Sequence, residues 1–202
     1  MQRNNSFHST IRHDGLYDPR FEHDSCGVGF LARLDAMPQH EIVRHALQTL
    51  INLEHRGAVG GDTATGDGAG VMLHIPDELF RSEHLGFHLP EAGQYAVGMV
   101  FLPNKKSVAD RCVKMFERIV EEEACEVLGW RAVAVQDGPL GELAKSTQPV
   151  IRQIFIGRGR VALSHLPRKL YVIRRQVEKA VAELKDAARS EEHTSELQSP
   201  NT

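Results

Sequence analysis

The stretch CGVGFLARL (residues 26–34) is the first continuous apolar segment of this 202-residue chain. Its apolar run predicts a buried β-strand, and the small residues at its start leave the backbone open to the close approach of a ligand. The 25 residues before it are rich in Asn, Ser, His, Asp and Arg and follow neither a strand period nor a helix period. We therefore expect a leader at 1–25 and a folded region that begins at Cys26.

Composition and charge restrict the classes of partner. Hydrophobic residues make up 41% of the chain and charged residues 25%, which is ordinary for a folded protein. The formal net charge is −3 with no basic stripe that would attract a phosphate backbone, so we expect no nucleic-acid partner. No apolar run approaches the roughly 18 residues of a membrane span, and the polar start lacks a secretory signal. We expect a cytoplasmic protein without a membrane partner.

Neither the cysteines nor the histidines predict a metal site. The three cysteines form no C-x-x-C pair and leave one thiol over, which argues against both a disulfide framework and a zinc knuckle; they are Cys26, Cys112 and Cys125. The nearest pair of histidines, His84 and His88, brackets a glycine in an expected loop, and solvated side chains are the simpler interpretation.

The next segment predicts a helix followed by a loop. From about Gln39 to Glu54 the apolar residues recur on one face, with Pro38 suited to the helix start and Gly57 to its end. The glycine-rich stretch at 57–70 predicts a loop whose backbone comes close to something. It leads into a strand rather than a helix, so a phosphate cradle is not indicated.

The rest of the chain predicts an α+β fold. Apolar runs predict four strands, at 71–75, 95–102, 131–135 and 150–156. An S-x-x-D capping signal at 107–110 predicts a helix whose apolar stripe includes Cys112 and Val127. Cys125 is expected near the end of this helix as a structural cysteine, and the acidic cluster at 121–123 as a solvated face. A last helix follows Pro167. Because the strands are nearly all apolar, we expect stacked sheets between helical layers.

Cys26 is the one cysteine without a helical explanation. A thiol has a reference pKa of about 8.5 and attacks only as the thiolate, so it needs a base. If the bond between Ser25 and Cys26 is cut, the freed α-amine, with a reference pKa of about 7.7 to 8.0, is such a base. Nucleophile and base would then belong to one residue. From the residues alone, a buried structural cysteine remains the alternative.

Four blocks of sequence in one order resemble the N-terminal glutaminase domain of the glutamate synthase family. The combination of HRGAVG with TGDGAG separates this family from other amidotransferases with an N-terminal nucleophile. The blocks are GLYDPRFEHDSCGVGF (15–30), NLEHRGAVGGDTATGDGAG (52–70), LGWRAVAVQDGPLG (128–141) and PVIRQIFI (149–156).

The resemblance implies a fold and a set of site residues. The fold is part of the four-layer αββα sandwich of N-terminal nucleophile hydrolases. Processing between Ser25 and Cys26 makes Cys26 residue one, and its thiol attacks the side-chain amide of glutamine to give a thioester and ammonia. Arg56 lies near the active site, where it orients the catalytic terminus or holds substrate charge; a surface arginine is the alternative. Gly57 permits a close turn beside it.

The resemblance also implies a larger enzyme. Ammonia passes to a downstream synthase domain with FMN and an iron–sulfur cluster, where 2-oxoglutarate becomes glutamate; neither cofactor has ligands in this segment. The electron donor, NADPH through a flavoprotein small subunit or ferredoxin, stays open. Two alternatives remain: an amidotransferase of purine or amino-sugar synthesis, and a structural or regulatory domain without chemistry.

Three departures from the family pattern bear on activity. Ala134 stands where the family commonly has proline, a change expected to affect local rigidity only. No Asn-Gly pair occurs in the sequence, although this pair stabilises the oxyanion in the family. The polar stretch RSEEHTSELQSPNT (189–202) resembles a translated sequencing adapter. We therefore expect the native domain sequence to span 26–188, followed by a non-native tail, and this chain alone to be inactive.

Overall fold

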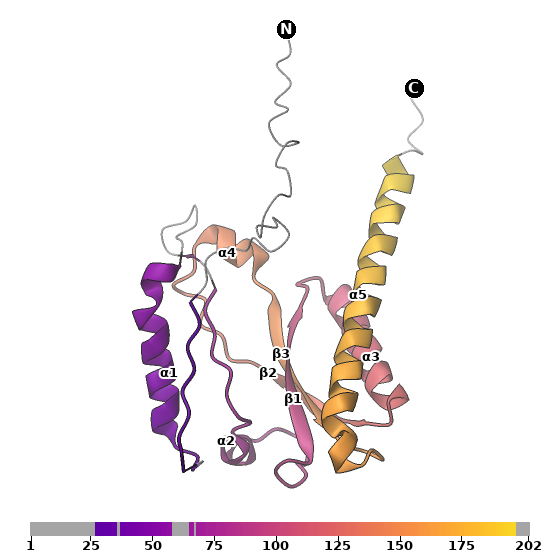
Figure 1. Cartoon of the computed structure of the whole chain (residues 1–202). Coiled ribbons are helices and arrows are strands. Elements are labelled where there is room, and N and C mark those ends of the chain that lie inside the picture. Colours follow the sequence, from indigo (N-terminus) through magenta and orange to yellow (C-terminus); the bar gives the residue numbers. More distant parts are fainter. Residues whose placement is uncertain (1–26, 36, 58–64, 67, 197–202) are drawn as a thin grey trace, which may run out of the picture. The chain divides into compact units, whose positions relative to one another are not determined.

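The computed structural model of the chain describes residues 27–35, 37–57, 65–66 and 68–196, with the backbone alone at 185–196 (Figure 1). The expected leader at 1–25 and most of the glycine-rich loop lie outside the described residues. The chain divides into two compact units, Met1–Val71 and Met72–Thr202. No helix within the described residues is long and apolar enough to span a membrane.

The first unit is built around helix α1 (His40–Asn52), which is followed by one 3-10 turn, η2 (Glu54–Arg56). The helix predicted from Gln39 to Glu54 is therefore confirmed to within two residues. No residue of α1 is fully buried, and part of its predicted apolar stripe, including Leu47 and Ile51, is more than half exposed. Within this unit, α1 offers more apolar surface than the described residues cover.

The second unit contains a three-stranded antiparallel sheet in the order β1-β3-β2. Its strands are β1 (Tyr95–Leu102), β2 (Glu126–Ala132) and β3 (Val150–Gly157). The register pairs Tyr95 with Gly157 and Leu102 with Val150, so β1 and β3 match along their full length. The strands predicted at 95–102 and 150–156 are confirmed. With its helices, this sheet makes the fold α+β.

Two helices cover one face of this sheet (Figure 1). They are α3 (Lys106–Glu122) and α5 (Leu166–Glu196). Val120, Ile154 and Ile173 are at most 1% exposed where the helices meet the strands, and they form the centre of the main core. The helix predicted after Pro167 is confirmed, and its backbone continues past 188 to Glu196.

An aromatic cluster covers the other face of β3. Phe155 is fully buried and meets the ring of Phe80 edge-on, with ring centroids 4.9 Å apart; Phe80 lies on α2 (Asp77–Ser82). Phe87 also packs on Phe155, at 5.1 Å. A Cβ at Gly129 would lie 2.3 Å from the Phe87 ring, so this close approach requires glycine at the bulge of β2.

An ion pair ties this cover to the sheet. Arg131 on β2 donates from Nε and Nη2 to the two carboxylate oxygens of Glu83, at 2.6 and 2.7 Å. Its Nη1 donates to Oε1 of Gln153 on β3 at 2.9 Å. Because a guanidinium presents a planar fork of donors, this two-pronged contact fixes the segment after α2 against two strands.

Two predicted strands are wrong within the described residues. Residues 27–34 and 71–75 are not in strands, and most of their apolar side chains are exposed: Val28 is 86%, Phe30 93% and Met72 99% exposed. A strand exists only where a second strand completes its backbone hydrogen bonds, and no described strand pairs with either segment. An apolar run shows that a segment has side chains to bury, but it does not show which second strand would pair with its backbone.

The helix predicted from Ser107 is confirmed as α3, but its predicted capping pair and its predicted end near Val127 are wrong. Lys105 is the N-cap residue without a side-chain cap bond, so Ser107 and Asp110 do not form a capping pair. The helix ends at Glu122, and Ala124 has a φ of 61°, which turns the chain into β2. Cys125 and Val127 therefore lie beyond the helix. The strand predicted at 131–135 begins earlier, at Glu126, and ends at Ala132.

The sequence predicted a solvated acidic cluster at 121–123, but one of its three glutamates, Glu123, is largely buried. The Glu123 side chain is only 16% exposed and accepts a hydrogen bond from Nζ of Lys169 on α5 at 2.6 Å. Gln176 on α5 donates to its other oxygen at 2.5 Å. The Lys169 bond is the main cause that holds the pKa of Glu123 below its usual range. Glu123 thus joins the end of α3 to α5.

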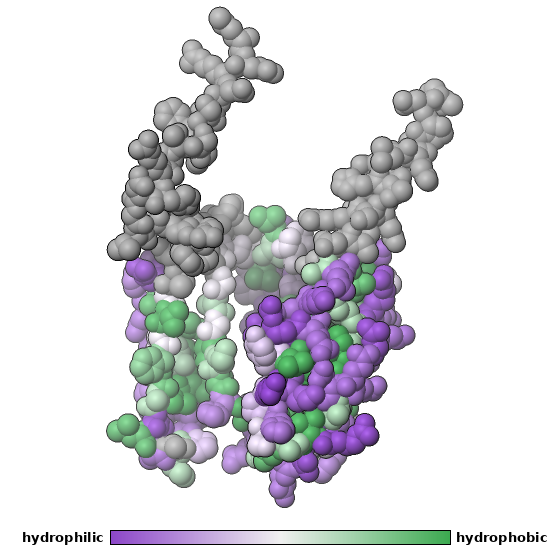
Figure 2. Space-filling model, turned by 45° about the vertical axis from the view of Figure 1, so that its right-hand side comes forward, coloured by the Kyte–Doolittle hydropathy of each residue, from purple (hydrophilic) through white to green (hydrophobic). Residues whose placement is uncertain are grey.

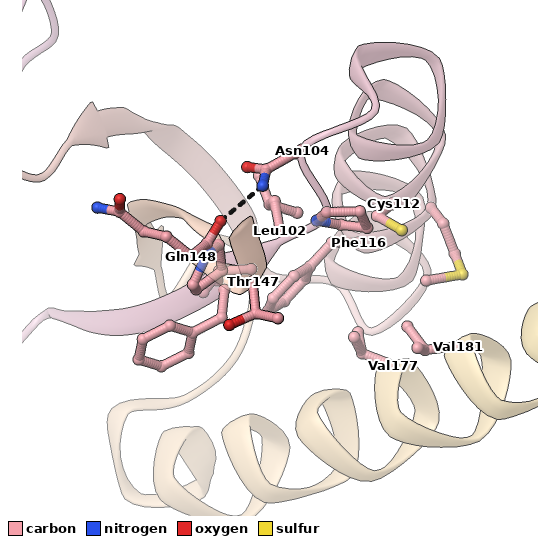
Figure 3. Close-up of a pocket in the computed structure, with 13 residues that line it drawn as sticks. Leu102, Asn104, Cys112, Phe116, Thr147, Gln148, Val177 and Val181 are labelled. Carbon is pink, nitrogen blue, oxygen red and sulfur yellow. Dashed lines mark hydrogen bonds between the residues drawn. The ribbon is translucent and has the colours of Figure 1, made fainter. Parts of the chain in front are cut away.

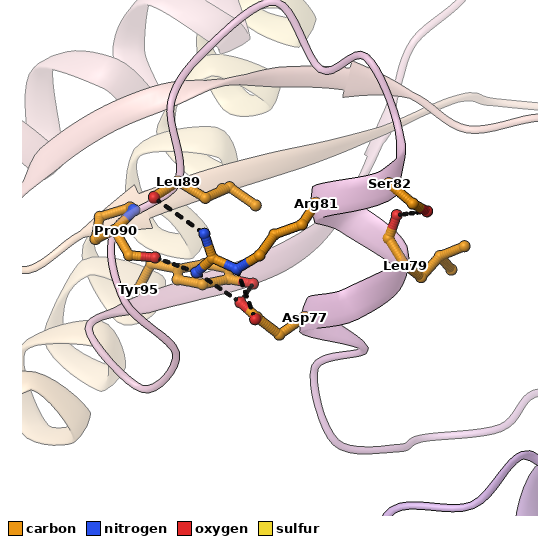
Figure 4. Close-up of polar contacts among 7 residues, drawn as sticks. All are labelled: Asp77, Leu79, Arg81, Ser82, Leu89, Pro90 and Tyr95. Atoms are coloured by element: carbon orange, nitrogen blue, oxygen red, sulfur yellow. Dashed lines mark hydrogen bonds and ion pairs between the residues drawn. The ribbon is translucent and has the colours of Figure 1, made fainter.

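A polar network holds α2 against the start of β1 (Figure 4). Arg81 donates from Nε to the Asp77 carboxylate at 2.7 Å, and its Nη1 donates to the Leu89 carbonyl at 3.4 Å. The Tyr95 hydroxyl donates to Asp77 Oδ1 at 2.8 Å. Burial first, and the Asp77 contact second, raise the pKa of Tyr95 to about 12.

We expect this network to weaken in strong alkali. The folded protein binds the Tyr95 proton more tightly than the unfolded chain, whose tyrosines ionise near pH 10. The stabilisation is therefore complete below about pH 10 and is lost as the pH rises through about 12. Ultraviolet titration of tyrosinate should show one late-ionising tyrosine, which disappears in Tyr95→Phe. Asp77→Asn should lower its pKa part of the way, because burial remains. A Tyr95 that ionises at its ordinary pKa would contradict the network.

Candidate catalytic segment

The predicted catalytic cysteine and its processing site, Ser25 and Cys26, lie outside the described residues. Gly27, the next residue in the chain, is the first one described. The site is therefore built from what surrounds Gly27 and from Arg56 and Gly57, the other two predicted site residues. All of these belong to the first unit.

The segment after Cys26 lies against α1 and the residue that follows it, through two glycines. A Cβ at Gly27 would lie 2.9 Å from Cδ2 of Leu53, and one at Gly29 would lie 2.8 Å from Cγ2 of Thr49. Real Cβ atoms essentially never approach this closely, so a larger residue at either position would force the Leu53 or Thr49 side chain to shift. Gly27 and Gly29 are two apart and contact residues four apart on one helical face, as an extended chain along a helix requires.

Arg56 and Gly57 follow the same end of α1. The Arg56 backbone N–H donates to the Leu53 carbonyl at 2.8 Å, and the Gly57 N–H donates to the Glu54 carbonyl at 3.0 Å. These bonds form the η2 turn. Arg56 is therefore three residues after Leu53, the residue against which Gly27 lies. The Arg56 side chain is exposed. Cys26 and Arg56 are paired in the sequence only by the family resemblance, whereas the structure brings Gly27 and η2 to the same end of α1.

Gly57 does not need the conformational freedom of glycine. Its φ of −90° and ψ of 156° are extended values that any residue adopts. The close turn expected at this position is instead made by the three residues of η2 before it. If glycine is required at position 57, the reason is the space that a side chain would occupy and not the backbone conformation.

The two cysteines of the second unit, Cys112 and Cys125, lie among the described residues. Cys125 is 6% exposed, and burial raises the pKa of its thiol, which keeps it protonated and unreactive. Its predicted structural role is confirmed, although it lies outside the helix. Cys112 is half-buried on α3 among apolar side chains, as predicted. His84 and His88 are both exposed, and within the described residues no three His, Cys, Asp or Glu side chains are grouped to hold a metal.

This chain belongs to the class-II glutamine amidotransferases: the family model matches residues 26–198. The match begins at Cys26. Known relatives narrow the class further. The chain is 45% identical over 166 residues to the large chain of glutamate synthase [NADPH] from Bacillus subtilis, and 46% identical over 147 residues to glutamate synthase [NADH] from Saccharomyces cerevisiae. It is 42% identical over 167 residues to ferredoxin-dependent glutamate synthase 2 from Synechocystis.

The alignments cover most of this chain and little of the relatives. They include 81%, 69% and 80% of this chain, in the same order. They include only 11%, 7% and 11% of the relatives, so the chain spans about a tenth of their length. The resemblance to the glutamate synthase family is confirmed. The roles of Ser25, Cys26, Arg56 and Gly57 stay predictions.

We expect a methyl group at Gly29 to loosen the first unit. Gly29→Ala places a Cβ against the Thr49 methyl, and overpacking of this kind costs about 1 to 3 kcal/mol of unfolding free energy. Thr49→Ser removes that methyl and keeps the hydroxyl, which donates to the His45 carbonyl at 2.9 Å, so the double variant should recover much of the loss. Urea unfolding followed by circular dichroism measures both.

Gly68→Ala is the matched control for this test, because a Cβ there has no neighbour within 4 Å among the described residues. Equal effects of the Gly29 and Gly68 substitutions, or no recovery in the double variant, would show that 27–34 does not lie along α1.

Proposed function

We propose that this chain is the first part of the glutaminase domain of a glutamate synthase, with Cys26 as its nucleophile. The observation that carries the proposal is the start of the family match at Cys26, the residue that the sequence singled out as a possible new N-terminus. In this proposal the leader at 1–25 is removed, and Cys26 becomes residue one. The names of the relatives support glutamate synthase as the enzyme.

The proposed reaction needs one residue to supply both nucleophile and base. The freed α-amine of Cys26 takes the thiol proton while the sulfur attacks the side-chain amide carbon of glutamine. The carbon–nitrogen bond breaks, the amine returns the proton to the leaving nitrogen, and ammonia departs from a thioester. Water then hydrolyses the thioester, which releases glutamate and restores the thiol. The reference pKa of an α-amine, about 7.7 to 8.0, suits this exchange near neutral pH.

The geometry around Gly27 supports a role for Arg56 in this site. Because Cys26 is bonded to Gly27, the contact of Gly27 with Leu53 ties the proposed nucleophile to the end of α1 from which η2 and Arg56 continue. A guanidinium there can hold the carboxylate of glutamine or orient the new N-terminus. Gly57 completes the proposed site beside it, where the lack of a side chain leaves room.

We propose that the complete domain is a four-layer αββα sandwich. In each unit, helices cover one side of the extended segments. Within the described residues, some apolar side chains on the other side are exposed. In the first unit these include Val28, Phe30 and Leu34, and Figure 2 shows apolar side chains gathered on the block that carries α1. In the second unit, Met99 and Phe101 on β1 are 50% and 64% exposed. Inner sheets of such a sandwich need apolar faces of this kind.

The wider enzyme belongs to the same proposal. Ammonia would pass to a downstream synthase domain that converts 2-oxoglutarate to glutamate with FMN and an iron–sulfur cluster. These cofactors would bind in that downstream synthase domain. The relatives' names include NADPH, NADH and ferredoxin. A flavoprotein small subunit would serve a pyridine-nucleotide donor, and the location would be cytoplasmic.

Two rivals make different predictions. An amidotransferase of purine or amino-sugar synthesis would hydrolyse glutamine but would not reduce 2-oxoglutarate. A structural or regulatory domain would keep its leader and would not release ammonia. The mass of the mature N-terminus, together with glutaminase and synthase assays on the product of the intact gene, separates all three.

We expect the mature enzyme to begin at Cys26. Intact-protein mass spectrometry should show loss of residues 1–25, and Cys26→Ala should reduce glutamine-dependent turnover by a factor of about 1,000 or more. Free ammonia should still support glutamate formation, since it bypasses the thioester. Retention of glutamine-dependent activity with the leader attached, or without the sulfur, would refute the mechanism.

We expect the 202-residue chain itself to be inactive. It holds no Asn-Gly pair to stabilise the oxyanion, and loss of one oxyanion donor typically costs a factor of about 100 to 1,000 in rate. Ammonia release from glutamine, measured beside the product of the intact gene, checks this. Turnover by the short chain within tenfold of the longer product would contradict it.

A further inference from the structure

An apolar cavity opens between the two helices and the end of the sheet in the second unit (Figure 3). It has a volume of about 290 Å³. Cys112 and Phe116 reach it from α3, and Val177 and Val181 point toward them from α5. The remaining wall comes from the end of β1 and from the residues just before β3, at 147–149. None of the predicted site residues lines it.

The lining favours an uncharged, apolar occupant. No charged side chain is among the residues that form the wall. The one hydrogen bond across it runs from Nδ2 of Asn104 to the Gln148 carbonyl, at 2.7 Å. Glutamine, glutamate and 2-oxoglutarate all carry charges, and transfer of an unpaired charge into such surroundings costs several kcal/mol. The cavity therefore does not suit the reactants of the proposed enzyme.

The position of the cavity favours polypeptide over a small molecule. β1 is an outer strand of the sheet, so within the described part its other edge has no strand partner. Val100 and Leu102 lie on this strand and line the cavity. A free edge beside an apolar cavity offers backbone hydrogen bonds and a side-chain pocket together, which is how a sheet accepts an added extended segment.

We propose that this cavity receives an apolar side chain from a segment of the same polypeptide that follows residue 188 in the product of the intact gene, laid beside the end of β1. The inference rests on the proposed function, in which the chain is part of a longer enzyme. The relatives support such a length, because the aligned region is only 7 to 11% of them. The cavity is then a docking point inside the enzyme, not a ligand site, and it joins α3 and α5 to a later segment of the polypeptide.

Photo-crosslinking in the product of the intact gene tests this assignment. Cys112 is replaced by an amino acid with a short diazirine side chain, the protein is irradiated, and the linked peptides are identified by mass spectrometry. We expect links to a peptide that lies beyond residue 188 in the same polypeptide and outside α5. The same replacement at Lys114, an exposed residue on α3 outside the lining, should give at least tenfold fewer such links.

Each other outcome overturns the proposal. Links confined to Val177, Val181 and their neighbours would show a cavity that stays empty. A product of doubled mass would show a second copy in the cavity, and a linked small molecule would show a ligand site. Glutaminase activity is measured on the same sample. Activity that depends on Cys26 without distal links refutes the cavity assignment alone, whereas distal links without such activity refute the proposed function alone.

Discussion

Strand β3 must bury both of its faces, and the rest of the second unit depends on that requirement. Ile154 and Ile156 pack toward α3 and α5, while Phe155 between them packs into the rings of the opposite cover. β1 and β2 pair with its two edges, so its backbone hydrogen bonds are completed on both sides as well. The polar ties lie around this centre: Arg131 holds the aromatic cover to the strands, and Glu123 holds α3 to α5.

The sequence predicted well the elements whose evidence is local. A long apolar stripe was enough for α1 and α5, and the uninterrupted runs at 95–102 and 150–156 were enough for β1 and β3. It failed where the deciding contact is distant in the chain. A glycine such as Gly129 usually weakens a strand. Gly129 nevertheless lies inside β2, where the Phe87 ring occupies the space that a Cβ would fill. The six-residue helices α2 and α4 (Glu142–Thr147) are too short to show a period.

The candidate site divides in the same way. Chemistry alone could single out Cys26, because the other two thiols lie within apolar surroundings, and resemblance added Arg56. Neither could give the reason for the glycines at 27 and 29, which is the surface of α1 and Leu53 against them. Gly57 shows the limit of motif reasoning: the motif suggested a special backbone, and the backbone there is ordinary. Glycine in a motif can mark space for another group as well as a turn.

The uncovered apolar side chains and the proposed chemistry lead to one physical argument. A nucleophile whose base is its own α-amine works well only where that amine is held in place, because a mobile terminus loses the orientation that makes the proton transfer efficient. Within the described residues, the start of the folded region rests on a single helix, and Phe30 beside it is 93% exposed. An aromatic ring left in water at that point contributes nothing to holding the terminus. Covering the face that carries Phe30 would therefore bury apolar surface and immobilise the chain next to Cys26 in the same step, which couples completion of the proposed sandwich to catalysis.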